Sequence, residues 1–201
     1  MGFLKGSLGI KRYFIENPDA FREGREKVVE RMLRYQFRSI EGAAVEEAVG
    51  WVSPFRSYDS KIKVEDTFLD SNIFLAMRVD RKVVPRLLLD SKVNQKLDSG
   101  AVVVKGKQEL KQLKENMRQE LLLKALPEPR IIEGVIDLPH ATLYLNTASH
   151  RASGLFLSLF EKTFDVLPAH IDPTGFAFLT LKEDSKLQAL SDTEESCFHD
   201  I

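Results

Sequence analysis

Four basic side chains recur at helical spacing in the middle of the chain and could together bind a polyanion. Lys107, Lys111, Lys114 and Arg118 are separated by four, three and four residues. At about 3.6 residues per turn, they fall within about 60° of one another around a helix. A lysine and arginine row binds nucleic acid well because each phosphate that it neutralises releases a counterion. A solvated helix face would show the same pattern, so the spacing alone leaves both interpretations open.

A helix over residues 107–125 would position these cations. Its apolar residues form a separate stripe roughly a quarter turn away, and Pro127 and Pro129 end the helical stretch. The stripe comprises Leu110, Leu113, Met117 and Leu121. Lys105, just before the helix, and Lys124, near its end, complete the set of candidate nucleic-acid-binding residues.

The charge distribution favours a local basic surface on a protein that is nearly neutral overall. The chain has 201 residues and a formal net charge of −1. Residues 81–130 carry twelve basic and six acidic side chains, whereas residues 183–201 carry one basic and six acidic ones. This asymmetry argues against a uniformly basic protein that coats nucleic acid. Cys197 is the single cysteine, and no apolar run is long enough to span a membrane, so we expect a cytoplasmic protein.

The remaining patterns predict an α+β protein with a mostly antiparallel sheet and packed helices. Helices alternate with pairs of strands, which is not the order of a doubly wound parallel sheet. The strands are expected at 7–15, 43–55, 73–79, 130–138, 141–147 and 176–181, and the helices at 18–37, 85–98, 107–125 and 149–166, with a surface loop or hairpin over 56–70. Leu87, Leu88, Val93 and Leu97 are expected to point inward from the second of these helices.

Motifs of several enzyme classes are missing. The chain has no phosphate-binding loop, dinucleotide fingerprint or Gly-x-Ser-x-Gly elbow, and its four histidines lack metal-site spacing. A metal-dependent nuclease would need clustered carboxylates. Glu133, Asp137 and Asp172 are the candidates for such a cluster, but strand-edge and turn positions explain them more simply. We therefore expect no cofactor, no metal and no catalytic activity, with a nuclease as the less favoured alternative.

Several segments occur in the order found in a known protein family. They are Phe3-Leu4-Lys5-Gly6-Ser7-Leu8, the turn Gly50-Trp51-Val52-Ser53-Pro54, the helix start at Pro85, the helix end Leu121-Leu122-Leu123-Lys124-Ala125-Leu126-Pro127, and the strand-then-helix passage 135–168. Over roughly residues 1–181 the chain resembles the recombination-associated RdgC family of bacteria. The resemblance divides the chain into an RdgC-like region at 1–182, with a helical arm at about 85–126, and an acidic tail at 183–201.

The resemblance implies a DNA-binding protein without enzymatic activity. Members of the family form a ring-shaped homodimer around double-stranded DNA, bind it with little sequence preference, and limit access of the RecA recombinase. Some have been labelled exonucleases. The resemblance therefore implies duplex DNA as partner, a homodimer, antagonism of a recombinase and a nucleoid-associated location. The basic row lies in the matching helical region, and lysine and arginine rows contact the DNA backbone without reading bases.

Two departures from the family limit what can be transferred. Family members are longer at the C-terminus, and the extra part helps to close the ring, so ring closure does not carry over, although a dimer through the remaining body stays open. Glu128, Pro129 and Arg130 stand where the family continues with basic and aromatic residues. An alternative function is a protein–protein interaction module that has lost DNA binding. Trp51 is expected to fill a core beneath its turn.

Overall fold

The computed structural model describes residues 9–100 and 102–171, together with the separate positions 175, 176, 186, 188, 189 and 192. In this part of the chain an antiparallel sheet has the order β2-β4-β5-β6-β1-β7, and β3 pairs with β4. The strands are β1 (Ile10–Phe14), β2 (Glu47–Val52), β3 (Phe68–Leu69), β4 (Asn72–Arg81), β5 (Glu128–Asp137), β6 (Thr142–Asn146) and β7 (Ala169–His170). The predicted α+β class is confirmed.

Two helices pack on one face of this sheet and enclose the core. These two are α1 (Arg25–Arg34) and α5 (His150–Phe164). The other helices of the described residues are a 3-10 helix (Pro18–Phe21), α2 (Val64–Thr67), α3 (Arg86–Asp98) and α4 (Lys107–Lys124). Helices α1 and α5 contact each other, and their buried side chains join those of the strands in one apolar cluster. Ser149 caps α5 by accepting a hydrogen bond from the backbone N–H of Ala152.

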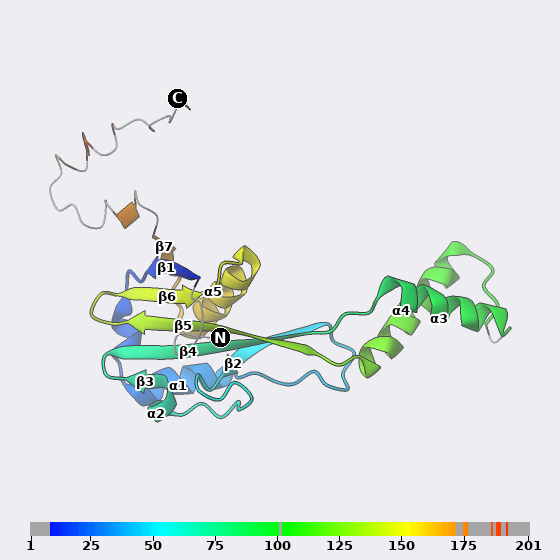
Figure 1. Cartoon of the computed structure of the whole chain (residues 1–201), viewed down its shortest axis with the longest axis horizontal. Coiled ribbons are helices and arrows are strands. Elements are labelled where there is room, and N and C mark those ends of the chain that lie inside the picture. Colours follow the sequence, from blue (N-terminus) through cyan, green and yellow to red (C-terminus); the bar gives the residue numbers. More distant parts are fainter. Residues whose placement is uncertain are drawn as a thin grey trace.

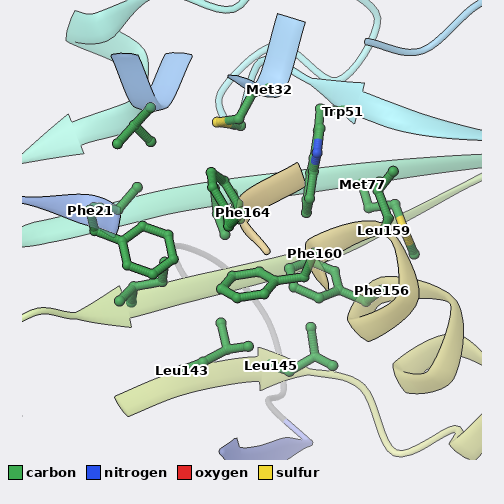
Figure 2. Close-up of a cluster of buried hydrophobic side chains, with 14 of the residues drawn as sticks. Phe21, Met32, Trp51, Met77, Leu143, Leu145, Phe156, Leu159, Phe160 and Phe164 are labelled. Atoms are coloured by element: carbon green, nitrogen blue, oxygen red, sulfur yellow. The ribbon is translucent and has the colours of Figure 1, made fainter. Parts of the chain in front are cut away.

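Aromatic side chains fill the centre of this core (Figure 2). Phe156, Phe160 and Phe164 follow one another at four-residue steps on α5 and point toward the sheet. Trp51 on β2 is fully buried beside them, and its ring meets that of Phe156 edge to face at 5.3 Å. The indole Nε1 donates to Thr163 Oγ1 over 2.8 Å, so its polar group is satisfied. The predicted core position of Trp51 is confirmed.

The N-terminal helix differs from the expected continuous span of 18–37. The chain forms a short 3-10 helix that ends at Phe21, continues without helical geometry over 22–24, and begins α1 at Arg25. Gly24 has a φ of 134°, which glycine adopts without steric cost. The segment 56–70, predicted as a loop or hairpin, contains α2 and β3 as well as irregular backbone. The predicted strand at 176–181 lies almost wholly outside the described residues.

Strands β4 and β5 continue beyond the body as a long ribbon that ends in the helical hairpin α3–α4, which we call the arm (Figure 1). Ten residue pairs of these strands are in register, from Asn72 with Asp137 to Arg81 with Glu128. The arm has a small core of its own, in which Val93 of α3 packs with Leu113 and Met117 of α4. The helices predicted at 85–98 and 107–125 are thus present.

The prediction that Leu87 and Leu88 point inward was wrong. Leu87 is 84% exposed and Leu88 is 44% exposed, whereas Val93 is buried. Helix α3 packs against α4 and stands off from the sheet, so only a narrow stripe of its surface is covered. Among the described residues, no helix is both long enough and apolar enough to cross a bilayer.

Candidate nucleic-acid interface

Helix α4 holds the basic row because its sequence separates apolar and charged sides. Leu113 and Met117 are buried against α3, and Leu110 and Leu121 are half-buried. The helix begins after Gly106 and ends at Lys124, two residues before Leu126-Pro127. At its start, Glu109 accepts a hydrogen bond from the backbone N–H of Lys105 at 2.7 Å. The helix runs from the outer end of the arm back to the body (Figure 1).

The inner half of the basic row is engaged in ion pairs. Lys114 Nζ lies 3.0 Å from Asp90 Oδ1 on α3, and Arg118 pairs with Glu46, which directly precedes β2 in the body. Lys114 thus joins the two helices of the arm, while Arg118 joins the arm to the body. Both basic side chains remain 44% exposed. Ion pairs at such exposure contribute about 0–1 kcal/mol each and can exchange partners readily.

The outer half of the row is free within the described part of the chain. Lys107 and Lys111 are exposed, one helical turn apart, and neither has an ion-pair partner among the described residues. Lys105 and Lys124 are also exposed, and their side chains have no ion-pair partner in the described part of the chain. Lys124 lies outside the row, because seventeen residues after Lys107 the helix has turned to a different side. The structure therefore places Lys107 and Lys111 on one face of α4, with Lys105 just before the helix, and puts Lys124 on a different side.

The carboxylates considered for a nuclease do not form a common site in the described residues. Asp137 Oδ2 lies 2.8 Å from His140 Nδ1 at the turn between β5 and β6. Glu133 occupies the same strand four residues earlier, and Asp172 lies outside the described residues. Among the residues searched, no group of three or more His, Cys, Asp or Glu side chains could hold a metal ion.

A second cationic group is present that the sequence did not reveal. Arg81 at the end of β4, Arg130 near the start of β5 and Arg151 in the first turn of α5 line the same pocket. They lie far apart in the sequence and follow no helical period. The register that pairs Val79 with Arg130 is what brings the strand arginines together, and it is set by tertiary packing.

These features define an α+β protein in which one antiparallel sheet supports a basic helical arm. The chain matches the family described as "Putative exonuclease, RdgC" over residues 13–176, and it belongs to the RdgC family. It is also similar to the "Recombination-associated protein RdgC" of Bordetella parapertussis, with 25% identity over 125 residues. That alignment covers 61% of this chain and 40% of the relative. The family resemblance noted in the sequence is confirmed.

Proposed function

We propose that the protein binds double-stranded DNA without sequence preference, through phosphate contacts made by the arm, and that this binding serves the control of recombination. The observation that carries the proposal is the exposed pair Lys107 and Lys111, which have no carboxylate partner among the described residues. Their ammonium groups attract phosphate as point charges. The name of the Bordetella relative supports the connection with recombination.

Lys114 and Arg118 can also contact phosphate, once they exchange their carboxylate partners for it. Lys114 and Arg118 are half-exposed, and their pairs with Asp90 and Glu46 are of the weak, exchangeable kind. A phosphate approaching Lys111 would lie within one turn of Lys114, and could compete with Asp90 for it. We therefore expect the outer lysines to contribute most and the inner ones less.

A homodimer, antagonism of a recombinase and nucleoid association belong to the same proposal. Exposed apolar side chains of the arm region are the candidate contacts of such a dimer, since Leu87, Val103 and Leu126 are 84%, 75% and 77% exposed. Static light scattering over a concentration series tests this part. A mass equal to one chain at every concentration would contradict it and would also weaken the alternative of a protein–protein interaction module.

The central experiment is a titration of a fluorescent 30-base-pair duplex with the whole protein at 50 and 200 mM salt. The double variant Lys107→Glu/Lys111→Glu should bind at least tenfold more weakly at low salt, and should lower the salt slope by about one unit per lost phosphate contact. The matched control is Lys61→Glu/Lys63→Glu, which changes net charge equally in the segment between β2 and α2. Equal losses in both variants would contradict binding through the arm.

A nuclease is the second candidate, because the description of the matching family includes the word exonuclease. We propose that the protein has no catalytic step. Incubation of end-labelled duplex with the purified protein and Mg²⁺ or Mn²⁺ should leave the label on full-length strands. Release of labelled mononucleotides, reduced by Glu133→Gln or Asp137→Asn, would replace the proposal with a metal-dependent hydrolysis.

A further inference from the structure

The three arginines of the second cationic group surround an apolar hollow between the sheet and the first turn of α5. The floor is formed by Val79 of β4, Ile132 of β5, and Ala152 and Leu155 of α5. Val79 and Ile132 also belong to the main core, so the floor is continuous with it. The hollow has a cavity volume of about 90 Å³. This is below the roughly 300–1,000 Å³ of small-molecule pockets, so the hollow suits a single inserted side chain and not a whole small ligand.

The arginines stand at the rim because the sheet extends further than the helix that covers it. Arg81 follows Val79 by two residues on β4, and Arg130 precedes Ile132 by two on β5, so both arginines share the face of the core residues. Beyond the start of α5, that face is exposed to solvent. Arg81 and Arg130 have no ion-pair partner among the described residues, whereas Arg151 is held by Glu47 at 2.6 Å.

We propose that this hollow binds an acidic peptide segment of a partner protein, with one apolar side chain of the peptide on the floor and its neighbouring carboxylates on Arg81 and Arg130. The two halves of the site require different chemistry from the occupant. The floor favours an aliphatic or aromatic group, because burying apolar surface there removes it from water. The free guanidinium groups at the rim form bidentate pairs with carboxylates. A peptide that alternates acidic and apolar residues supplies both within one short segment.

Charge and composition favour a peptide over nucleic acid at this site. A DNA backbone would satisfy the arginines but would place no apolar group on Ala152 and Leu155, the partly exposed residues of the floor. Glu47 also lines the hollow, but it is paired with Arg151, so Arg81 and Arg130 are the cations left for the carboxylates of the peptide. The site belongs to the sheet and α5, whereas the free lysines belong to the outer half of α4. The inference therefore does not rest on DNA binding by the arm.

The test is a peptide array in which the central residue of Glu-Asp-Glu-X-Asp-Glu is varied over all twenty amino acids, probed with the whole protein. Members with Leu, Ile, Met or Phe at X should bind, and soluble fluorescein-labelled copies give the affinities. Arg81→Glu/Arg130→Glu should weaken binding of the best peptide at least tenfold. Ala152→Phe, which fills the hollow and leaves the arginines in place, should weaken it as well. Circular dichroism checks that both variants are folded.

Three outcomes would overturn the proposal. One is that no member of the array binds, and another is that polar residues at X bind as well as apolar ones, which would leave only nonspecific charge attraction. The third is that Arg81→Glu/Arg130→Glu keeps its peptide affinity but loses duplex affinity as severely as Lys107→Glu/Lys111→Glu. In that case the arginines would be part of a nucleic-acid surface. The control Lys107→Glu/Lys111→Glu should keep full peptide binding.

Discussion

Asp80 on β4 illustrates how a charged residue is accommodated inside this fold. Its carboxylate is fully buried and accepts two hydrogen bonds from the Arg78 guanidinium, at 2.6 and 2.8 Å. The same guanidinium lies over the ring of Phe37, 4.5 Å from its centroid. The hydrogen bonding that Arg78 donates to Asp80 raises the pKa of Arg78 above its ordinary value. A buried charge is tolerated here because its partner satisfies both oxygens.

Replacing Asp80 with Ala should therefore destabilise the protein by about 3 kcal/mol, because Arg78 would remain partly buried without a counter-charge. Urea unfolding followed by circular dichroism measures the loss. The matched control is Glu30→Ala, which removes the partner of Arg34 in an exposed pair of 2.9 Å on α1. That change should cost less than about 1 kcal/mol. Similar losses in the two variants would contradict the special role of burial.

A different carboxylate gives a prediction about pH. Arg56 donates a hydrogen bond to Asp66 Oδ2 at 3.0 Å, and this bond is the main reason that the pKa of Asp66 is lowered. A carboxylate whose folded pKa is lowered stabilises the fold above its unfolded pKa of about 3.9, and loses this effect as the pH falls through the folded value. Asp66→Asn should thus melt at a lower temperature than the native protein at pH 7.

The melting temperatures of the two proteins should converge as the pH falls below about 4 and through the lowered pKa of Asp66, since protonated Asp66 no longer differs from Asn in charge. Thermal unfolding at half-unit pH intervals measures the difference. The other carboxylates are the same in both proteins, so their titration does not contribute to the difference in melting temperature. A gap that stays constant down to pH 2, or widens, would show that Asp66 contributes through packing and not through its charge.

At the level of secondary-structure elements, β2 is fixed by an unusually close approach of another segment. A Cβ atom added to Gly50 would lie 2.4 Å from Phe37 Cα and 2.5 Å from Phe37 N. The segment after α1 pairs with β2 here in a parallel bridge between Gln36 and Trp51, and Trp51 exchanges backbone hydrogen bonds with Tyr35 and Phe37. Only glycine leaves enough space for so close an approach.

Gly50→Ala should destabilise the protein by at least about 2 kcal/mol, because backbone cannot move aside as a flexible side chain can. Gly154→Ala is the matched control: it lies within α5, and nothing lies within 4 Å of the added methyl group. That substitution should be neutral or stabilise by up to about 1 kcal/mol through helix propensity. Chemical unfolding of the two variants separates the effects, and equal stability of both would refute the steric argument.

Helices and strands with strong local sequence signals were predictable. The residues that they contact in the folded protein were not. The period of α4 and the prolines after it gave nearly correct bounds, and the apolar run at 73–79 correctly indicated β4. The break at Gly24 was missed, because a single glycine inside an apolar period is only a weak signal. The sequence also placed Lys114 and Arg118 on one helix face. It could not show that Asp90 and Glu46 lie beside them, since those contacts depend on the packing of α4 against α3 and the body.

On the scale of the whole molecule, the position of the arm depends on a buried lysine at its base. Lys82 directly follows β4 and is 2% exposed. Its Nζ donates to the backbone oxygen of Ala43, in the body, and to that of Leu122, in the last turn of α4, both at 2.8 Å. Arg118 and Glu46 add an exposed ion pair between the same two parts. One ammonium group thus joins the body and the arm, and it satisfies polar groups on both sides.

Lys82→Met keeps most of the apolar stem but leaves the oxygens of Ala43 and Leu122 without this donor. We expect amide hydrogen exchange at 121–125 and at 43–46 to become roughly tenfold faster, the factor that corresponds to about 1.4 kcal/mol of local stability. Exchange in the α5 core should change little. Lys61→Met, at an exposed lysine, serves as the control and should leave both segments unaffected.

The same variant separates two ways in which the arm could hold DNA. If the lysines act as independent point charges, a looser arm should keep the salt slope and lose only a few-fold in affinity. If they must be presented in a fixed direction by the body, Lys82→Met should weaken duplex binding nearly as much as Lys107→Glu/Lys111→Glu while leaving both lysines in place. The second outcome is the one we expect, because the buried hydrogen bonds of Lys82 hold the last turn of α4 to the body. An unchanged duplex affinity alongside accelerated exchange would contradict it.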